Sequence, residues 1–198
     1  MLFRSGRWRT FASVAISAAT LTAASILVFG PDVFMTFLAD LPRTAQSLVT
    51  DGAAGWSKLQ SLYGLARSLG ASNTAAWAGQ GAMSLACAVA IIVLWRSRAS
   101  SDLKAAALAV AATLVTPYVF AYDLPVLGVA AAFLYRHRRF DRWDYAALAV
   151  SIPAWLALPT ATFPTGLFAS LALAAVIARR CVVAMAAPRD GDGALAIE

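Results

Sequence analysis

An apolar block from Ala105 to Tyr135 constrains this chain more than any other feature, because it carries a single formal charge, Asp123, near its middle. As one helix the block would be about 47 Å long at roughly 1.5 Å per residue, whereas a bilayer core is only about 30 Å thick. Pro117 disfavours helical backbone at Thr116, and Asp123 just ahead of Pro125 is typical of a helix N-cap. The block therefore predicts two short helices that double back through a polar turn.

Basic residues flank this block on both sides, and their distribution predicts a topology. Arg96, Arg98 and Lys104 precede the block, and four arginines follow it between Arg136 and Arg142. Lysine and arginine gather in cytoplasmic loops, so the block should cross the membrane twice with its turn at the outer face. The whole chain then crosses about six times, with both termini in the cytoplasm. In that topology the lysines and arginines that face outward are Arg43, Lys58 and Arg67.

The composition excludes a soluble globular domain, since hydrophobic residues make up 61% of the sequence and charged residues 13%. We predict an all-α polytopic membrane helix bundle over residues 1–186 and a disordered cytoplasmic tail over residues 187–198. The net charge of +6 falls in short inter-helix loops, so nucleic acid is not expected as a partner. Cys87 and Cys181 should lie at different membrane depths and His137 stands alone, so no disulfide, metal site or cofactor is expected.

Residues 31–73 form the longest segment that is not expected to span the membrane. A short apolar stripe near its start ends at Pro42. Further on, Ser57 and Gln60 have the spacing of a capping box, ahead of an amphipathic helix from Lys58 to Leu69. Both pieces are expected to lie in the outer membrane interface, where they either cover the bundle or form the wall of an outer-face site.

Apolar runs outside the central block supply the other four crossings. The first is either a retained helix that enters from the cytoplasm or a signal peptide, although it is long for the latter. Gln80 is a deep polar side chain whose amide either links helices or contacts a ligand. Ser101 with Asp102 should cap the central block, and Asp141 with Asp144 the helix that follows it. The four runs are Phe11–Phe29, Thr74–Trp95, Trp143–Leu158 with a kink near Pro153, and Phe163–Cys181.

Several short segments occur in an order that is typical of one enzyme family. One is Ala111–Leu124, which reads Ala-Ala-Thr-Leu-Val-Thr-Pro-Tyr-Val-Phe-Ala-Tyr-Asp-Leu, and its most specific piece is the Thr-Pro-Tyr…Tyr-Asp turn at residues 116–123. The others are Arg7-Trp8-Arg9, Phe29-Gly30-Pro31, Ser61-Leu-Tyr-Gly-Leu-Ala-Arg-Ser-Leu-Gly70, and Trp77 with Gln80. Over roughly residues 4–175 the chain resembles the C-terminal half of glycosyltransferase family 87, whose members are integral-membrane enzymes of the C-type glycosyltransferase fold.

The resemblance implies a hexosyltransferase, typically a mannosyltransferase, that uses a polyprenyl-phosphate sugar donor at the outer face of the plasma membrane. Membrane lipids and this donor are the implied partners. In the mannosyltransferase branch the turn resembles Ser-Pro followed by a Trp and paired histidines, whereas this chain has Thr116-Pro117 and Tyr122-Asp123. The family's usual base is a carboxylate in the first outer loop, and this chain is expected to be a truncated one that begins after it. No catalytic residue is assigned, and Asp32 is better explained as an acid at a helix start.

Transfer of a sugar from such a donor needs a base, cations or hydrogen-bond donors for the leaving phosphate, and a groove for the isoprenoid. The candidate substrate-binding residues are polar groups expected at the outer face. Asp123 is an N-cap, a substrate contact, or both. Tyr118 and Tyr122 either belong to the interfacial aromatic belt or stack on a sugar. The remaining candidates are three cations, Arg43, Lys58 and Arg67, which are expected to bind either lipid headgroups or the phosphate.

A second hypothesis, from a different class, is a small six-helix membrane scaffold or transporter-like protein without enzymatic activity. A transporter should contain internal repeats and buried polar residues near the middle of the membrane. The sequence shows no convincing repeat, and Gln80 is its main deep polar side chain. The structural role of Gln80 therefore helps to separate the two hypotheses.

Overall fold

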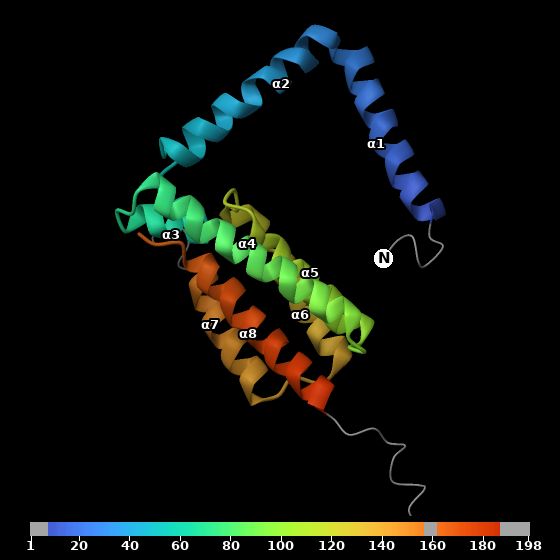
Figure 1. Cartoon of the computed structure of the whole chain (residues 1–198), viewed down its shortest axis with the longest axis vertical. Coiled ribbons are helices and arrows are strands. Elements are labelled where there is room, and N and C mark those ends of the chain that lie inside the picture. The colour runs from blue at the N-terminus through green and yellow to red at the C-terminus, as the bar shows by residue number, and fades with distance from the viewer. Residues whose placement is uncertain (1–7, 157–161, 187–198) are drawn as a thin grey trace, which may run out of the picture. The chain divides into compact units, whose positions relative to one another are not determined.

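The computed structural model describes residues 8–156 and 162–186, and every regular element in these residues is a helix, as predicted (Figure 1). The chain divides into two compact units, residues 1–51 and 52–198. The α-helices are α1 (Trp8–Phe29), α2 (Pro31–Ala45), α3 (Leu62–Ser68), α4 (Asn73–Arg96), α5 (Ser101–Val115), α6 (Val126–His137), α7 (Arg142–Leu156) and α8 (Thr165–Ala186). Short π or 3-10 turns lie at Gln46–Thr50, Trp56–Lys58 and Ala121–Asp123.

The first unit contains α1 and α2, which are joined at Gly30. The φ angle of Gly30 is 86°, a left-handed conformation that glycine adopts at little cost. The prediction that the apolar stripe of α2 ends at Pro42 is wrong, because the helix continues to Ala45. A proline inside a helix removes one backbone hydrogen bond, and its ring needs space beside the preceding turn. Pro42 is exposed, so the helix can accommodate it.

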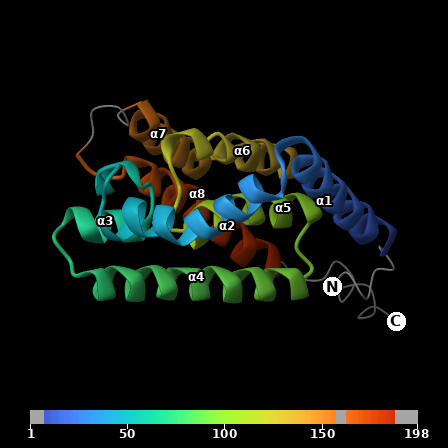
Figure 2. The same cartoon turned by 90° about the horizontal axis from the view of Figure 1, so that it is seen from above.

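In the second unit, α4 to α8 lie side by side around one apolar core (Figures 1 and 2). α5 contacts α4, α6 and α8, and α7 packs along α8. The core side chains of α5 are small or branched, so the neighbouring helices can approach it closely. They are Leu103, Ala106, Val110, Ala111, Thr113 and Leu114.

The central apolar block folds as the predicted helical hairpin. α5 and α6 pack against each other, and the turn between them begins at Thr116. Thr116 has an extended backbone (φ −100°, ψ 141°), which is the conformation that Pro117 favours in the residue before it. The prediction that Asp123 is the N-cap of the second helix is wrong. The N-cap of α6 is Pro125, and Asp123 lies in a separate 3-10 turn.

The helix predicted from Lys58 is shorter and starts later than expected. The N-cap of α3 is Ser61, whose Oγ accepts a hydrogen bond from Gly64 N at 3.1 Å. Ser57 and Gln60 do not form a capping box. Instead, Gln60 Nε2 donates to the backbone carbonyl of Ser57 at 3.2 Å. The capping prediction failed because α3 starts at Ser61, and because Gln60 Oε1 accepts a hydrogen bond from distant backbone at Gly166.

The starts of α5 and α7 follow the predictions more closely. Ser100, one residue before the predicted Ser101, caps α5. At the start of α7, Asp141 Oδ1 accepts from Trp143 N at 2.9 Å, and Asp144 Oδ2 accepts from Asp141 N at 2.7 Å. The two aspartates therefore satisfy backbone donors that the first turn of a helix leaves free.

Three helices of the described chain are long and apolar enough to cross a membrane: Ala12–Phe29 in α1, Asn73–Arg96 in α4, and Thr165–Val183 in α8. α5, α6 and α7 contain 15, 12 and 15 residues. At about 1.5 Å per residue these three are roughly 18–23 Å long, less than the bilayer core of about 30 Å. The chain is therefore a helical membrane protein, and its six crossings are not confirmed.

The second unit has two chemically different ends. At the first, which we call the basic end, a hydrogen bond joins Ser100 Oγ to His137 Nδ1 at 2.8 Å, and an ion pair joins Arg136 to Asp102 at 3.1 Å. The other, which we call the turn end, contains α3, the start of α4 and the turn before α6. Of the described lysines and arginines, Lys58 and Arg67 lie at the turn end. Those at the basic end are Arg96, Arg98, Lys104, Arg136, Arg138, Arg139, Arg142, Arg179 and Arg180.

A buried ion pair holds the basic end together. The side chains of Arg180 and Asp144 are 7% and 2% exposed, and they form two contacts, one of them from Nε to Oδ1 at 3.1 Å. Nη1 of Arg180 also donates to the carbonyl oxygen of Leu134 at 2.7 Å. Beside this pair, Arg179 binds Asp141 at 2.5 Å. One network of charge-assisted hydrogen bonds thus joins α6, α7 and α8.

Candidate functional site

The turn between α5 and α6 is held in shape by its own polar groups. Asp123 Oδ2 accepts a hydrogen bond from Phe120 N at 2.9 Å, and Thr116 Oγ1 accepts one from Tyr118 N at 3.2 Å. Tyr122 stacks on Phe120 with ring centroids 5.5 Å apart, and it is 76% exposed. Asp123 is exposed as well, so the turn presents a carboxylate and an aromatic ring at its surface.

The segment that precedes α3 packs directly on this turn. Gln60 N donates to the carbonyl oxygen of Val119 at 2.7 Å, and Ser61 Oγ donates to that of Pro117 at 3.0 Å. Both Gln60 and Ser61 are buried. The turn and the α3 segment, which lie far apart in the sequence, therefore form one continuous surface at the turn end.

The side chain of Gln60 extends this arrangement to α8. Its Oε1 accepts a hydrogen bond from Gly166 N at 2.8 Å, in the first turn of α8. A Cβ added at Gly166 would lie 2.4 Å from Leu124 Cδ1 and 3.0 Å from this oxygen. A side chain at this position would therefore displace Leu124 and Gln60 where α8 approaches the turn. The sequence pattern placed Gln60 in a local cap and gave no sign of this distant partner.

Gln80 links three elements of the fold. Its Oε1 accepts from Tyr63 N at 3.1 Å, while its Nε2 donates to the carbonyl oxygens of Leu114 at 2.9 Å and Val115 at 3.1 Å. The residue is buried, and its amide oxygen and nitrogen both have partners from the backbone. Such an arrangement favours the interhelical link over a ligand contact. It removes the main sequence argument for a transporter.

We expect Gln80→Leu to lower the free energy of unfolding by about 1–3 kcal/mol, because buried backbone groups of α3 and α5 lose their partner. Thermal unfolding of the purified protein in detergent, followed by circular dichroism, measures the loss. Gln46→Leu is the matched control, since Gln46 is exposed and should change stability by less than about 0.5 kcal/mol. Equal effects of the two substitutions would contradict the structural role of Gln80.

Tyr63, which the sequence analysis did not single out, lies buried at the turn end. Its hydroxyl donates to Asn73 Oδ1 at 2.7 Å, and its ring lies 5.1 Å from that of Trp77. Burial raises the pKa of the Tyr63 phenol, Arg67 opposes this rise, and Tyr118 adds to it. An aromatic residue at helical spacing is usually a core residue, so the sequence carried no signal for it.

The three outward cations have different surroundings. Arg67 packs over the ring of Trp56 at 4.1 Å, and its Nη1 donates to the carbonyl oxygen of Ala71 at 2.8 Å. Lys58 is exposed at the end of a 3-10 turn. Arg43 belongs to the first unit, where it pairs with Asp40 at 3.4 Å on an exposed helix surface. Exposed pairs of that kind contribute little to stability.

The structure thus brings five of the six candidate residues to one end of the second unit. They supply one carboxylate, two phenols and two cations, which can accept and donate hydrogen bonds to a sugar and balance the charge of a phosphate. No group of three or more metal-ligating side chains occurs among the residues that the structure describes. The five are Lys58, Arg67, Tyr118, Tyr122 and Asp123.

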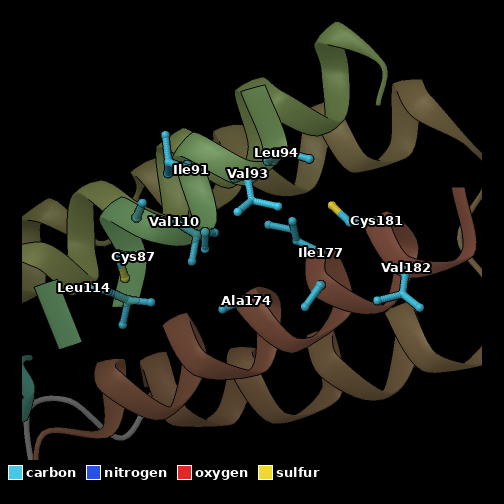
Figure 3. Close-up of a pocket in the computed structure, with 14 residues that line it drawn as sticks. Cys87, Ile91, Val93, Leu94, Val110, Leu114, Ala174, Ile177, Cys181 and Val182 are labelled. Carbon is cyan, nitrogen blue, oxygen red and sulfur yellow. The ribbon is translucent and has the colours of Figure 1, made fainter. Parts of the chain in front are cut away.

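Several apolar grooves run along the second unit. The first begins at Leu124 and Pro125 of the turn and continues between α6, α7 and α8, with a volume of about 370 Å³. The second, of about 280 Å³, lies between α4, α5 and α8 (Figure 3). Cys87 and Cys181 have free thiols and lie toward opposite ends of this second groove. The first groove begins at Leu124, the residue after Asp123, and so adjoins the turn.

The fold and the site define a class of protein, namely a helical membrane protein with a polar end beside an apolar groove. The sequence profile of glycosyltransferase family 87 matches residues 1–117. The match covers more than half of the chain, which therefore belongs to this family of membrane glycosyltransferases. The match ends at Pro117. We expected the resemblance over residues 4–175, and the profile covers it only as far as the turn between α5 and α6. No curated protein and no solved structure matches the chain.

Proposed function

We propose that this chain acts in the transfer of a hexosyl group, mannose in particular, from a polyprenyl-phosphate sugar at the outer face of the plasma membrane. Membership of glycosyltransferase family 87 supports the proposal. The observation that carries it is the turn end, which contains a carboxylate, two tyrosines and two cations, and at which an apolar groove begins with Leu124. A lipid-linked sugar has the matching parts, namely sugar hydroxyls, a phosphate and a long apolar chain.

In such a reaction the bond between the sugar C1 and the phosphate oxygen breaks, and a bond from C1 to the acceptor oxygen forms. The proton of the acceptor hydroxyl passes to a base, which we do not assign. Asp123, Tyr118 and Tyr122 would bind the sugar, and Lys58 and Arg67 would bind the phosphate. Arg43 belongs to the first unit and stays a prediction from the sequence. The groove along α6, α7 and α8 would hold the isoprenoid.

The proposed topology has six crossings, with both termini and the basic end in the cytoplasm. Nine lysines and arginines at the basic end, against Lys58 and Arg67 at the turn end, support this orientation. α5, α6 and α7 are short for a crossing, but their adjoining turns pack against neighbouring helices. Irregular backbone is tolerated at membrane depth where protein covers it.

A thiol at Tyr122 tests the orientation. In a chain that carries Cys87→Ala and Cys181→Ala, we expect Tyr122→Cys to react with a membrane-impermeant maleimide in intact cells. Arg98→Cys, which is exposed at the basic end, should react only after the cells are opened. The opposite pattern would place the turn end in the cytoplasm and contradict the proposed site.

Binding of the donor tests the proposed substrate. We expect the full chain in nanodiscs to bind radiolabelled polyprenyl-phosphate mannose, and Lys58→Ala to weaken this binding about tenfold or more, since a charged hydrogen bond contributes about 1.5–3 kcal/mol. Arg98→Ala is the matched control, because it removes an exposed cation from the basic end. Absence of donor binding, or equal losses from the two substitutions, would contradict the proposal.

A further inference from the structure

The basic end carries more positive charge than its internal ion pairs neutralise. Its nine lysines and arginines face three aspartates, Asp102, Asp141 and Asp144, which leaves an excess of six positive charges among the described residues. The exposed side chains of Arg138 and Arg139 form no hydrogen bond or ion pair within the part of the chain that the structure describes. This end therefore attracts anions.

A small polar cavity of about 80 Å³ lies within this end, between the end of α6, the start of α7 and the end of α8. It is lined by three arginines, Arg138, Arg179 and Arg180, and also by His137, Asp141 and Val183.

The single carboxylate in the lining is already engaged. Arg179 binds Asp141, which also caps α7, and this contact lowers the pKa of the Asp141 carboxyl to about 2. Nε of Arg179 is buried and has no hydrogen-bond acceptor among the described residues. Buried donors normally have a partner, and an anion in the cavity would supply an acceptor close by.

An apolar groove of about 290 Å³ continues from this cavity along α7 and α8. Arg179 lines both the cavity and the groove, which also includes Trp143, Val150, Ala172 and Ala175. Trp143 is half exposed, and the guanidinium of Arg142 lies 5.4 Å from its ring centre. Tryptophan and arginine together are typical of the headgroup level of a membrane. The groove thus extends from headgroup level toward the apolar part of the bundle.

We propose that the cavity and the groove bind one anionic diacyl phospholipid, with its phosphodiester beside Arg138 and Arg179 and one acyl chain between α7 and α8. Charge complementarity selects the headgroup, because a zwitterionic lipid would bring its own cation to the arginines. Continuity of the cavity with the groove selects a lipid over a free phosphate. Basic pockets between membrane helices on the cytoplasmic side are suited to anionic headgroups.

Native mass spectrometry of the full chain in detergent tests this proposal. We expect dioleoyl-phosphatidylglycerol to bind at least about fivefold more tightly than dioleoyl-phosphatidylcholine, since each cation near the headgroup contributes roughly 1 kcal/mol. Glycerol phosphate, which has the same charged group without acyl chains, should show no comparable binding. Equal binding of the two lipids, or equally tight binding of glycerol phosphate, would overturn the proposal.

Matched substitutions locate the site. Arg138→Ala should weaken phosphatidylglycerol binding about fivefold, whereas Arg98→Ala, an exposed arginine outside the cavity, should leave it unchanged. Ala175→Trp should weaken binding by filling the groove, and Ala149→Trp, at an exposed position of α7 outside it, should not. Thermal unfolding confirms that each variant is folded. Equal losses from the two arginine substitutions, or from the two alanine substitutions, would contradict a discrete site.

Discussion

Asp144→Asn is expected to lower the free energy of unfolding by about 3–5 kcal/mol, because it leaves the buried charge of Arg180 without a counterion. Both side chains are more than nine-tenths buried, and the guanidinium also holds the end of α6 through the carbonyl of Leu134. Thermal unfolding in detergent, with loss of helical signal as the readout, measures the change. The ends of α6, α7 and α8 should separate first, since this network joins them.

Asp102→Asn is the control for that experiment. Asp102 pairs with Arg136, whose side chain is 68% exposed, and exposed pairs contribute only about 0–1 kcal/mol. Replacing both buried partners, as in Asp144→Leu with Arg180→Met, should recover much of the loss, because neither charge then remains buried alone. Similar losses from Asp144→Asn and Asp102→Asn would show that burial of the pair does not govern its contribution.

Gly64→Ala is expected to destabilise the turn end by about 3 kcal/mol or more, the upper part of the range for overpacking. The new Cβ would lie 2.2 Å from the backbone oxygen of Leu59 and 2.8 Å from that of Trp56. Backbone atoms cannot rotate away as a side chain can, so α3 must move. The bond from Ser61 Oγ to Pro117 O would then break, and hydrogen exchange in α3 should become faster.

Gly81→Ala provides the matched control for Gly64→Ala. Gly81 lies inside α4, and no atom lies within 4 Å of the position of an added Cβ. Alanine is a better helix former than glycine, so this variant should be more stable by up to about 1 kcal/mol. If Gly64→Ala leaves hydrogen exchange in α3 unchanged, the close packing of α3 on residues 56–59 is not the native arrangement.

Local patterns in the sequence predicted most of the helices. The length of the apolar block and the effect of Pro117 on Thr116 were sufficient for the hairpin of α5 and α6. The start of α7 was likewise predicted, since Asp141 and Asp144 bond to backbone within the same turn. In each case the decisive interaction joins residues close in sequence.

The predictions that failed concern groups whose partners are distant. Gln60 has the spacing of a capping residue, yet its side chain bonds to Gly166, more than 100 positions later. Asp123 has the position of an N-cap, yet it accepts a hydrogen bond from Phe120 and stabilises the turn. Each polar group has more than one possible partner, and the packing of the other helices determines which one it binds.

By itself, the sequence determined that this protein is an all-helical membrane protein of glycosyltransferase family 87, because hydropathy, charge distribution and short motifs are local properties of the chain. Only the tertiary structure decided that Gln60 packs against the turn, that Tyr63 is buried, and that Arg180 pairs with Asp144. Those contacts depend on which helix ends meet, and many arrangements of alanine-rich helices satisfy the same apolar pattern. The buried polar and charged groups select among these arrangements, because each must find a partner when it leaves water.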